Sequence, residues 1–60
     1  MPISGKEMVR RYKKAGWTLD HVRGSHHIMK NGNRTMPIPV HSNQSLNVGL
    51  EKKLLKELKN

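Results

Sequence analysis

The stretch RGSHHIMKNGNRTMPIPVH, residues 23–41, decides the fold because it contains two turn signals between extended segments. Gly24-Ser25 predicts the first turn, and Asn31-Gly32-Asn33 predicts a hairpin, since glycine and asparagine tolerate positive φ. The segments around these turns alternate apolar and polar residues, as strands do. The sequence therefore predicts three consecutive strands, over Trp17–Arg23, His26–Lys30 and Arg34–His41.

Alternation along each strand predicts which side chains share a face. In the first strand it places Trp17, Leu19 and His21 on one side, and Thr18, Asp20 and Val22 on the other. In the third strand, Pro37 and Pro39 are two residues apart, so their missing N–H groups lie on the same lateral side. Met36, Ile38 and Val40 then keep their backbone groups for the neighbouring strand. We expect the third strand to be an edge whose outward side is blunted by proline.

A helix is predicted on either side of the strands. Ser4 followed by Glu7 is a capping-box pattern, and Gly16 is a suitable stop, so the first helix is expected over Ser4–Ala15. Asn47 is a plausible N-cap for a last helix that runs to about Leu58. The first helix has an apolar face made of Met8, Val9, Tyr12 and Ala15, and the last has one made of Val48, Leu50, Leu54, Leu55 and Leu58.

The order of these elements predicts an α+β fold. Helix, three strands and helix give an α-β-β-β-α chain, in which a three-stranded antiparallel meander is covered on one face by both helices. Sixty residues are expected to form one domain, spanning 1–60, with a small core and marginal stability. Because the chain has no cysteine, disulfides and thiolate metal sites are excluded.

The charge of the chain indicates a polyanionic partner. Twelve Lys and Arg residues against four Asp and Glu residues give a formal charge of +8. These charges are interleaved with a regular apolar pattern, so they belong to a folded surface, and such a surface most often binds nucleic acid. An anionic membrane, an acidic protein, or no polyanion at all remain alternatives. The sequence shows no signal peptide and no apolar run of about 20 residues, so a cytoplasmic location is expected.

Histidine offers chemistry that the rest of the chain does not. The acidic residues are not spaced as metal ligands, so a metal-dependent nuclease is not expected. His26 and His27 are consecutive strand residues and point to opposite faces, which prevents them from chelating one metal. A neutral histidine beside an RNA phosphate could accept the proton of the ribose 2′-OH, while neighbouring cations stabilise the developing charge. The competing interpretation is an ordinary surface or hydrogen-bonding histidine.

The chain resembles the HicA-type toxins, the mRNA interferases of HicA–HicB toxin–antitoxin pairs. The resemblance rests on the opening helix that ends in "AGW", the central "RGSHHIM", the "MPIPVH" strand and the amphipathic last helix, in this order. It implies a double-stranded-RNA-binding-domain-like fold and a type II toxin that cleaves mRNA without metal or other cofactor. It makes His26 the catalytic histidine and Gly24 the motif glycine. It also implies a HicB-like antitoxin partner.

Several neighbouring residues are candidates for binding RNA or shaping the site. Gly24-Ser25 would turn the chain sharply and place His26 at an accessible strand start, and His41 matches a recurrent position of the family. The short Asn-Gly-Asn hairpin departs from the longer turn of many relatives. The full set of candidates beside His26 is Arg23, Gly24, Ser25, Lys30 and His41.

Two other functions fit the same architecture. A non-catalytic double-stranded-RNA-binding module has the same element order and needs no histidine after the turn. A small basic DNA-binding or interaction protein is the second, although no recognition-helix motif supports it. The RNA sequence preference, the group that protonates the leaving oxygen and the oligomeric state do not follow from the sequence.

Overall fold

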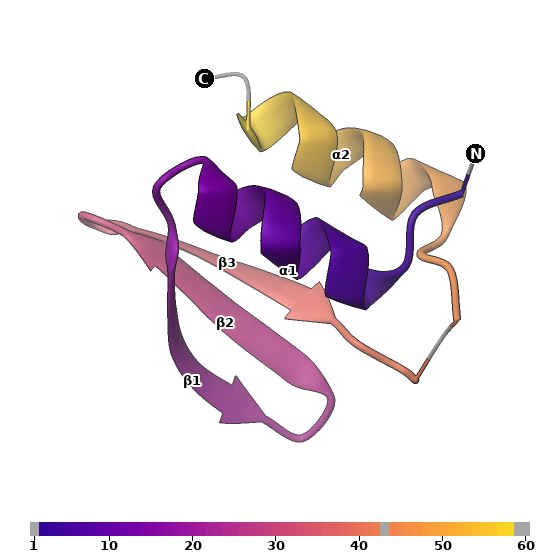
Figure 1. Ribbon diagram of the computed structural model, residues 1–60, viewed down its shortest axis with the longest axis horizontal. Coiled ribbons are helices and arrows are strands. Elements are labelled where there is room, and N and C mark those ends of the chain that lie inside the picture. The colour runs from indigo at the N-terminus through magenta and orange to yellow at the C-terminus, as the bar shows by residue number, and fades with distance from the viewer. Residues whose placement is uncertain (1, 43, 59–60) are drawn as a thin grey trace.

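The structure is a computed structural model that describes residues 2–42 and 44–58, and its elements follow the predicted order (Figure 1). The helices are α1 (Gly5–Lys14) and α2 (Val48–Leu58). The strands are β1 (Thr18–Arg23), β2 (His26–Asn31) and β3 (Arg34–Pro39), and they form one antiparallel sheet in the order β1-β2-β3. The α-β-β-β-α arrangement is confirmed, and so is the position of β3 at an edge.

Both helices lie on the same face of the sheet. α1 contacts all three strands, and α2 lies alongside α1 (Figure 1). The hydroxyl of Tyr12 in α1 donates a buried hydrogen bond of 2.8 Å to the carbonyl of Leu54 in α2. The opposite face of the sheet, called the open face below, is covered by no helix of residues 2–42 and 44–58. By the strand register its residues are Thr18, His21, Arg23, His26, Ile28, Lys30, Thr35, Pro37 and Pro39.

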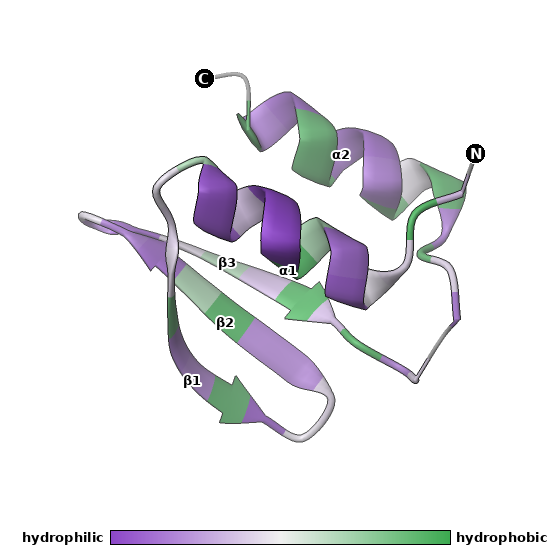
Figure 2. Ribbon diagram, in the orientation of Figure 1, coloured by the Kyte–Doolittle hydropathy of each residue, from purple (hydrophilic) through white to green (hydrophobic). Residues whose placement is uncertain are grey.

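The core lies between the sheet and the helices. Hydrophobic and hydrophilic positions alternate along the strands and around α2 (Figure 2). Side chains of α1, β2, β3 and α2 are buried, whereas every residue of β1 is exposed. Trp17 packs edge-to-face on Tyr12, with ring centroids 5.0 Å apart, and the Arg34 guanidinium lies over Trp17 at 5.3 Å. Arg34 also pairs with Glu57 of α2. The fully buried side chains are Met8, Tyr12, Met29, Ile38 and Leu54.

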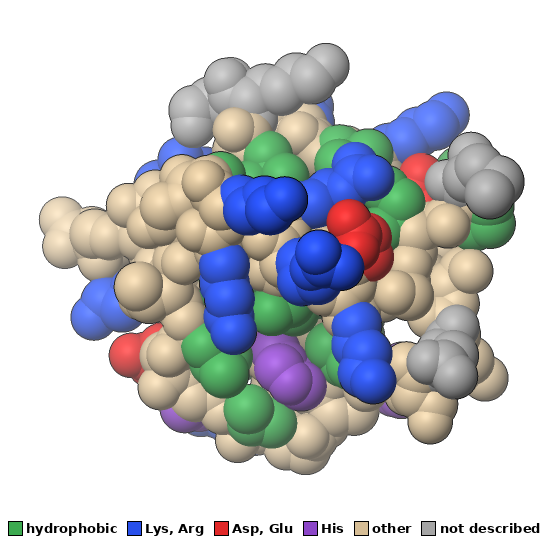
Figure 3. All heavy atoms as spheres, viewed as in Figure 1, with side chains coloured by type: hydrophobic (Ala, Val, Ile, Leu, Met, Phe, Trp, Pro, Cys, Tyr) green, Lys and Arg blue, Asp and Glu red, His purple; other side chains and the backbone are tan. Residues whose placement is uncertain are grey.

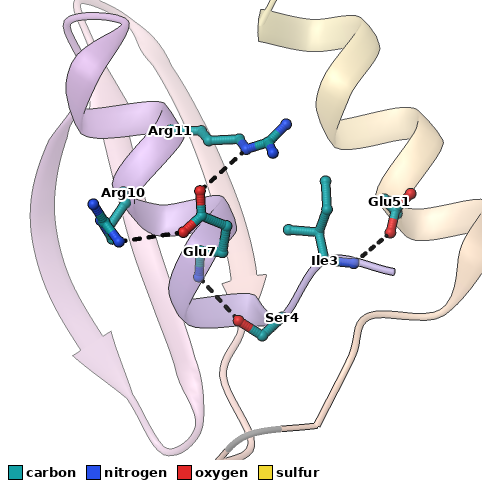
Figure 4. A network of polar contacts seen from close by, with 6 residues as sticks. All are labelled: Ile3, Ser4, Glu7, Arg10, Arg11 and Glu51. Carbon is teal, nitrogen blue, oxygen red and sulfur yellow. Dashed lines mark hydrogen bonds and ion pairs between the residues drawn. The ribbon is translucent and has the colours of Figure 1, made fainter. Parts of the chain in front are cut away.

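The helix ends form as the local sequence predicts. The Ser4 hydroxyl accepts a 3.1 Å hydrogen bond from the Glu7 backbone N–H, and the Asn47 side chain accepts one of 3.0 Å from Leu50. Gly16 has φ of +99°, which suits glycine after the end of α1. The capping box is only half formed, because the Glu7 carboxylate turns to Arg10 and Arg11 instead of Ser4 (Figure 4).

Two predicted core positions are wrong. Ala15 follows the end of α1 and is exposed, because the chain turns there toward β1. Val48 is 66% exposed, since it is the first residue of α2 and precedes the part of the helix that meets the core.

A β-bulge changes the predicted faces of β1. Leu19 pairs with Met29, but His21 pairs with Ile28, so Asp20 is an extra residue in the ladder. Direct partners share a face, and the bulge therefore puts His21 on the open face and Val22, with Leu19, on the helix side. The prediction that Leu19 and His21 lie on one side, and Val22 on the other, is wrong.

β3 ends at Pro39, two residues earlier than predicted. Pro37 and Pro39 stand opposite Ile28 and His26, and the last backbone bond from this segment runs from Val40 N–H to the Ser25 carbonyl at 2.7 Å. That bond confirms the prediction that the two prolines leave the backbone groups of the residues alternating with them available for pairing with the neighbouring strand. Beyond Val40 the neighbouring strand has turned away, so His41 has no partner in the sheet.

Candidate active site

His26 is the first residue of β2 and its side chain is exposed. It pairs with Arg23 across the first turn and with Pro39 on its other side. Directly opposed residues have Cβ atoms about 4.5–5.5 Å apart and point to the same face. The imidazole and the Arg23 guanidinium therefore project together from the open face, at the end of the sheet nearest the turn.

The turn that carries His26 is fixed by its backbone. Gly24 has φ of +60°, and no atom lies within 4 Å of the place where its Cβ would be. Glycine is thus needed at this position for conformation and not for space. The Ser25 carbonyl accepts the hydrogen bond from Val40, which ties the turn to the end of β3. This tie sets where β2 begins, and with it the position of His26.

The remaining predicted site residues divide between the two ends of the sheet. Lys30 shares the open face with His26 but lies four residues along β2, about 13 Å away at the strand rise of ~3.3 Å. His41 is exposed and lies two residues beyond Pro39, the partner of His26, so the backbone brings it to the same end of the sheet. The structure thus brings together Arg23, Gly24, Ser25, His26 and the backbone of His41, and leaves Lys30 apart.

His27 faces the opposite side of β2 and is half-buried beneath α1. It lines a pocket of about 350 Å³ with residues of α1, β1 and the segment after β3. Its Nδ1 atom is buried and has no hydrogen-bond partner among the described residues. Met29, also on this side, is the fully buried anchor of the strand. His26 and His27 lie on opposite faces as predicted, with His26 exposed and His27 half-buried at the edge of the core.

Sequence reasoning missed the cations around His27. Lys6, Arg10 and Lys13 all line its pocket. Their spacing of four and then three residues places them on one face of a helix, and that signal was present in the sequence. What the spacing does not give is the strand that this face meets.

The arrangement at His26 suits acid–base chemistry on an anionic substrate. An exposed imidazole can exchange a proton with a bound group, and the adjacent guanidinium can hold a phosphate oxygen. Over residues 2–42 and 44–58, no three His, Asp or Glu side chains lie close enough together to hold a metal ion. None of the helices in this part of the chain is long and apolar enough to cross a membrane.

Comparison with known proteins gives one family. No curated protein matches the chain significantly. The sequence profile described as "HicA toxin of bacterial toxin-antitoxin" matches residues 5–59, nearly the whole chain of 60 residues, and its span includes all five elements described above. The chain therefore belongs to the family of HicA toxins of bacterial toxin–antitoxin systems.

Proposed function

We propose that this protein is a metal-independent endoribonuclease, a single domain over residues 1–60, that cleaves mRNA as the toxin of a type II pair. The observation that supports this most is the place of His26. It is exposed at the start of β2, beside Arg23, on the open face of the sheet. A strand of RNA has room to reach the imidazole there without any rearrangement of the core.

In the proposed reaction His26 is the general base. Its neutral imidazole accepts the proton of a ribose 2′-OH, and the 2′-oxygen attacks the adjacent phosphorus as the bond to the 5′-oxygen breaks. The products are a 2′,3′-cyclic phosphate and a 5′-OH end, whose leaving oxygen takes up a proton. Arg23 lies where it can stabilise the charge that develops on the phosphoryl oxygens.

The other candidates act by holding the strand or shaping the turn. Lys30, farther along the open face, binds a phosphate away from the scissile bond. Gly24 and Ser25 set the turn from which His26 projects, and His41 stands at the same end of the sheet. None of these four residues needs to exchange a proton in this scheme.

The test is cleavage by purified His26→Ala protein. Removal of a positioned general base lowers the rate by about 10²–10⁴-fold, and the exposed position of His26 predicts that the fold survives. The matched control is His21→Ala, because His21 is another exposed histidine of the open face, bonded to Asp20. We expect the control to cleave at the wild-type rate. Full activity in a folded His26→Ala protein would sink the assignment, and binding without cleavage by the wild type would favour the non-catalytic RNA-binding module.

The toxin also needs a neutralising partner, which the family implies. We propose a HicB-like antitoxin whose docking surface is acidic, because it competes with RNA for a protein of charge +8. The simplest inhibition is steric, with the antitoxin covering His26 and the nearby cations Arg23 and Lys30.

A further inference from the structure

We propose that the pocket beneath α1 binds one unpaired nucleobase of the RNA strand, and that cations of α1 bind the phosphates beside it. The inference rests on the proposed function, since it names a second subsite for the same RNA. It concerns the face of β2 opposite to His26. The pocket is lined by Lys6, Val9, Arg10, Lys13, Leu19, His27 and Val40.

The floor of the pocket is apolar and open to solvent. Val9, Leu19 and Val40 supply it, and Leu19 is 39% exposed. Val22, which the bulge turns to this side, is 50% exposed. Figure 3 shows histidine and apolar side chains lying between Lys and Arg side chains on this view of the molecule. At about 350 Å³ the pocket is near the lower limit for small-molecule sites, a size that suits one planar ring system.

His27 gives this apolar lining a polar group that lacks a partner. Its Nδ1 is buried and unbonded within the described part of the chain. Buried polar atoms are nearly always hydrogen-bonded in native proteins, so an unbonded one calls for an explanation. The edge of a nucleobase carries both donors and acceptors, so it can bond the ring in either tautomer.

The cations of the pocket form a row. Lys6, Arg10 and Lys13 lie on one face of α1, about 6 Å and then 4.5 Å apart along the helix axis at a rise of ~1.5 Å per residue. Only Arg10 among them has an acidic neighbour in the described residues, Glu7 at 3.4 Å. A row of positive charges beside an apolar floor fits a strand whose phosphates flank each base.

Near the turn between β1 and β2, one RNA strand can contact both faces of β2. His26 and His27 are consecutive, so their Cα atoms are about 3.8 Å apart while their rings point to opposite faces. RNA that passes around this end of the sheet therefore reaches both. The base in the pocket belongs to a nucleotide close to the one that is attacked, and its capture would hold the strand in register with His26.

An acidic protein segment is the competing occupant of the pocket. Its carboxylates would pair with the cations equally well, but they would make no favourable contact with the apolar floor. A nucleotide meets the floor, the unbonded nitrogen and the cations together. We therefore assign the pocket to RNA and make the protein occupant an outcome of the test.

The experiment uses His26→Ala protein, so that the RNA stays intact. Its probes are hexauridylate and a hexamer of the same ribose-phosphate backbone without bases, which carry equal charge. Affinity is measured by competition, and the methyl groups of Val9, Leu19 and Val40 are followed by NMR. We expect the abasic strand to bind about tenfold more weakly, as loss of one base contact implies, and to leave these methyl signals unshifted.

Variants separate the hydrogen bond from mere packing. His27→Phe in the same background keeps a flat ring but removes the unbonded nitrogen. It is expected to bind hexauridylate about tenfold more weakly while its melting temperature rises, because the unsatisfied polar atom is gone. A purely structural histidine would not move affinity and stability in opposite directions. His21→Phe, on the other face, is the control for His27→Phe. Lys13→Ala removes a cation of the pocket row, and its control is Lys56→Ala on α2.

Several results would overturn the assignment. These are equal affinity for the two strands, unshifted pocket methyls on addition of hexauridylate, or methyl shifts produced by the antitoxin and not by RNA. The proposed catalysis is tested separately by wild-type cleavage. If the wild type cleaves RNA while the pocket methyls do not shift, the pocket assignment alone falls. If the pocket binds bases and the wild type does not cleave, the catalytic proposal falls and the pocket stands.

Discussion

Tyr12 shows how a single buried side chain makes the stability of the protein depend on pH. Burial, with a smaller contribution from the Glu57 carboxylate, raises the pKa of Tyr12 from 10.0 to about 12. In an unfolded chain a tyrosine has its usual pKa of about 10. The folded state therefore holds the phenolic proton more tightly. The stability this adds is complete below pH ~10 and is lost as the pH rises through about 12.

Tyr12→Phe is expected to remove that dependence. At neutral pH the variant should be about 1 kcal/mol less stable, because the 2.8 Å hydrogen bond to the Leu54 carbonyl is lost. Between pH 10 and 12 its free energy of unfolding should fall less steeply than that of the wild type. Urea unfolding across this range measures both slopes. Parallel curves would show that the phenol does not stabilise the fold through its proton.

At the scale of residues, the sequence predicts what depends on neighbours in the chain. Opposite faces for His26 and His27 follow from their adjacency alone. An accessible position for His26 at the start of a strand was expected, and the strand register places it on the open face. The grouping of α1 cations around His27 could not be predicted, because it depends on how the helix crosses the sheet.

At the scale of elements, α1 and β3 approach so closely that only glycine fits between them. A Cβ on Gly5 would lie 2.9 Å from the Val40 Cα and would clash with the Pro39 carbonyl oxygen. Both obstacles are backbone, so they cannot move aside as a side chain can. The contact also holds the segment at the end of β3. There the Val40 N–H donates a hydrogen bond to the Ser25 carbonyl in the turn before His26.

Gly5→Ala is therefore expected to destabilise the protein by about 1–3 kcal/mol through overpacking. Because the end of β3 must shift, the proposed RNA cleavage should also be slower in this variant. Gly49→Ala is the matched control, since a Cβ there meets only the Asn47 side chain at 3.5 Å. Alanine in a helix is favoured over glycine by up to about 1 kcal/mol, so the control should be neutral or stabilising. Equal urea midpoints for the two variants would contradict the close contact.

The elements themselves were predictable where their signals are local. The caps at Ser4 and Asn47, the glycine stop after α1 and both hairpin turns all form. The bulge at Asp20 and the early end of β3 were missed for one reason. Each depends on how a strand pairs with its neighbour, and the alternation of residues within one strand carries no information about that pairing.

At the scale of the whole molecule, family membership and charge lead to a prediction about the partner. Co-expression with a neighbouring HicB-like reading frame should give a complex that purifies over a tag on one chain and does not cleave RNA. The complex should melt at a higher temperature than the free toxin, because a partner that binds only the folded state stabilises it. Failure to co-purify, or a complex that still cleaves at the full rate, would defeat the prediction.

The molecule also shows why fold and family were accessible from sequence while the site was only partly so. Turn residues, helix periodicity and the ordered motifs extend along the whole chain, so each supports the others. The candidate site combines a turn, two strands and the segment after β3, and the proposed second subsite needs α1 as well. Such surfaces exist only once the elements have packed.

The most direct test of the proposed chemistry is cleavage of one RNA oligonucleotide in EDTA, beside the same oligonucleotide with a single deoxyribose at the scissile position. If His26 acts on the 2′-OH, the all-ribose strand is cut without metal and leaves a 2′,3′-cyclic phosphate or 3′-phosphate end. The deoxyribose strand then stays whole, because the attacking oxygen is missing. Cleavage of the deoxyribose strand at that position, or a strict requirement for Mg²⁺, would contradict the account.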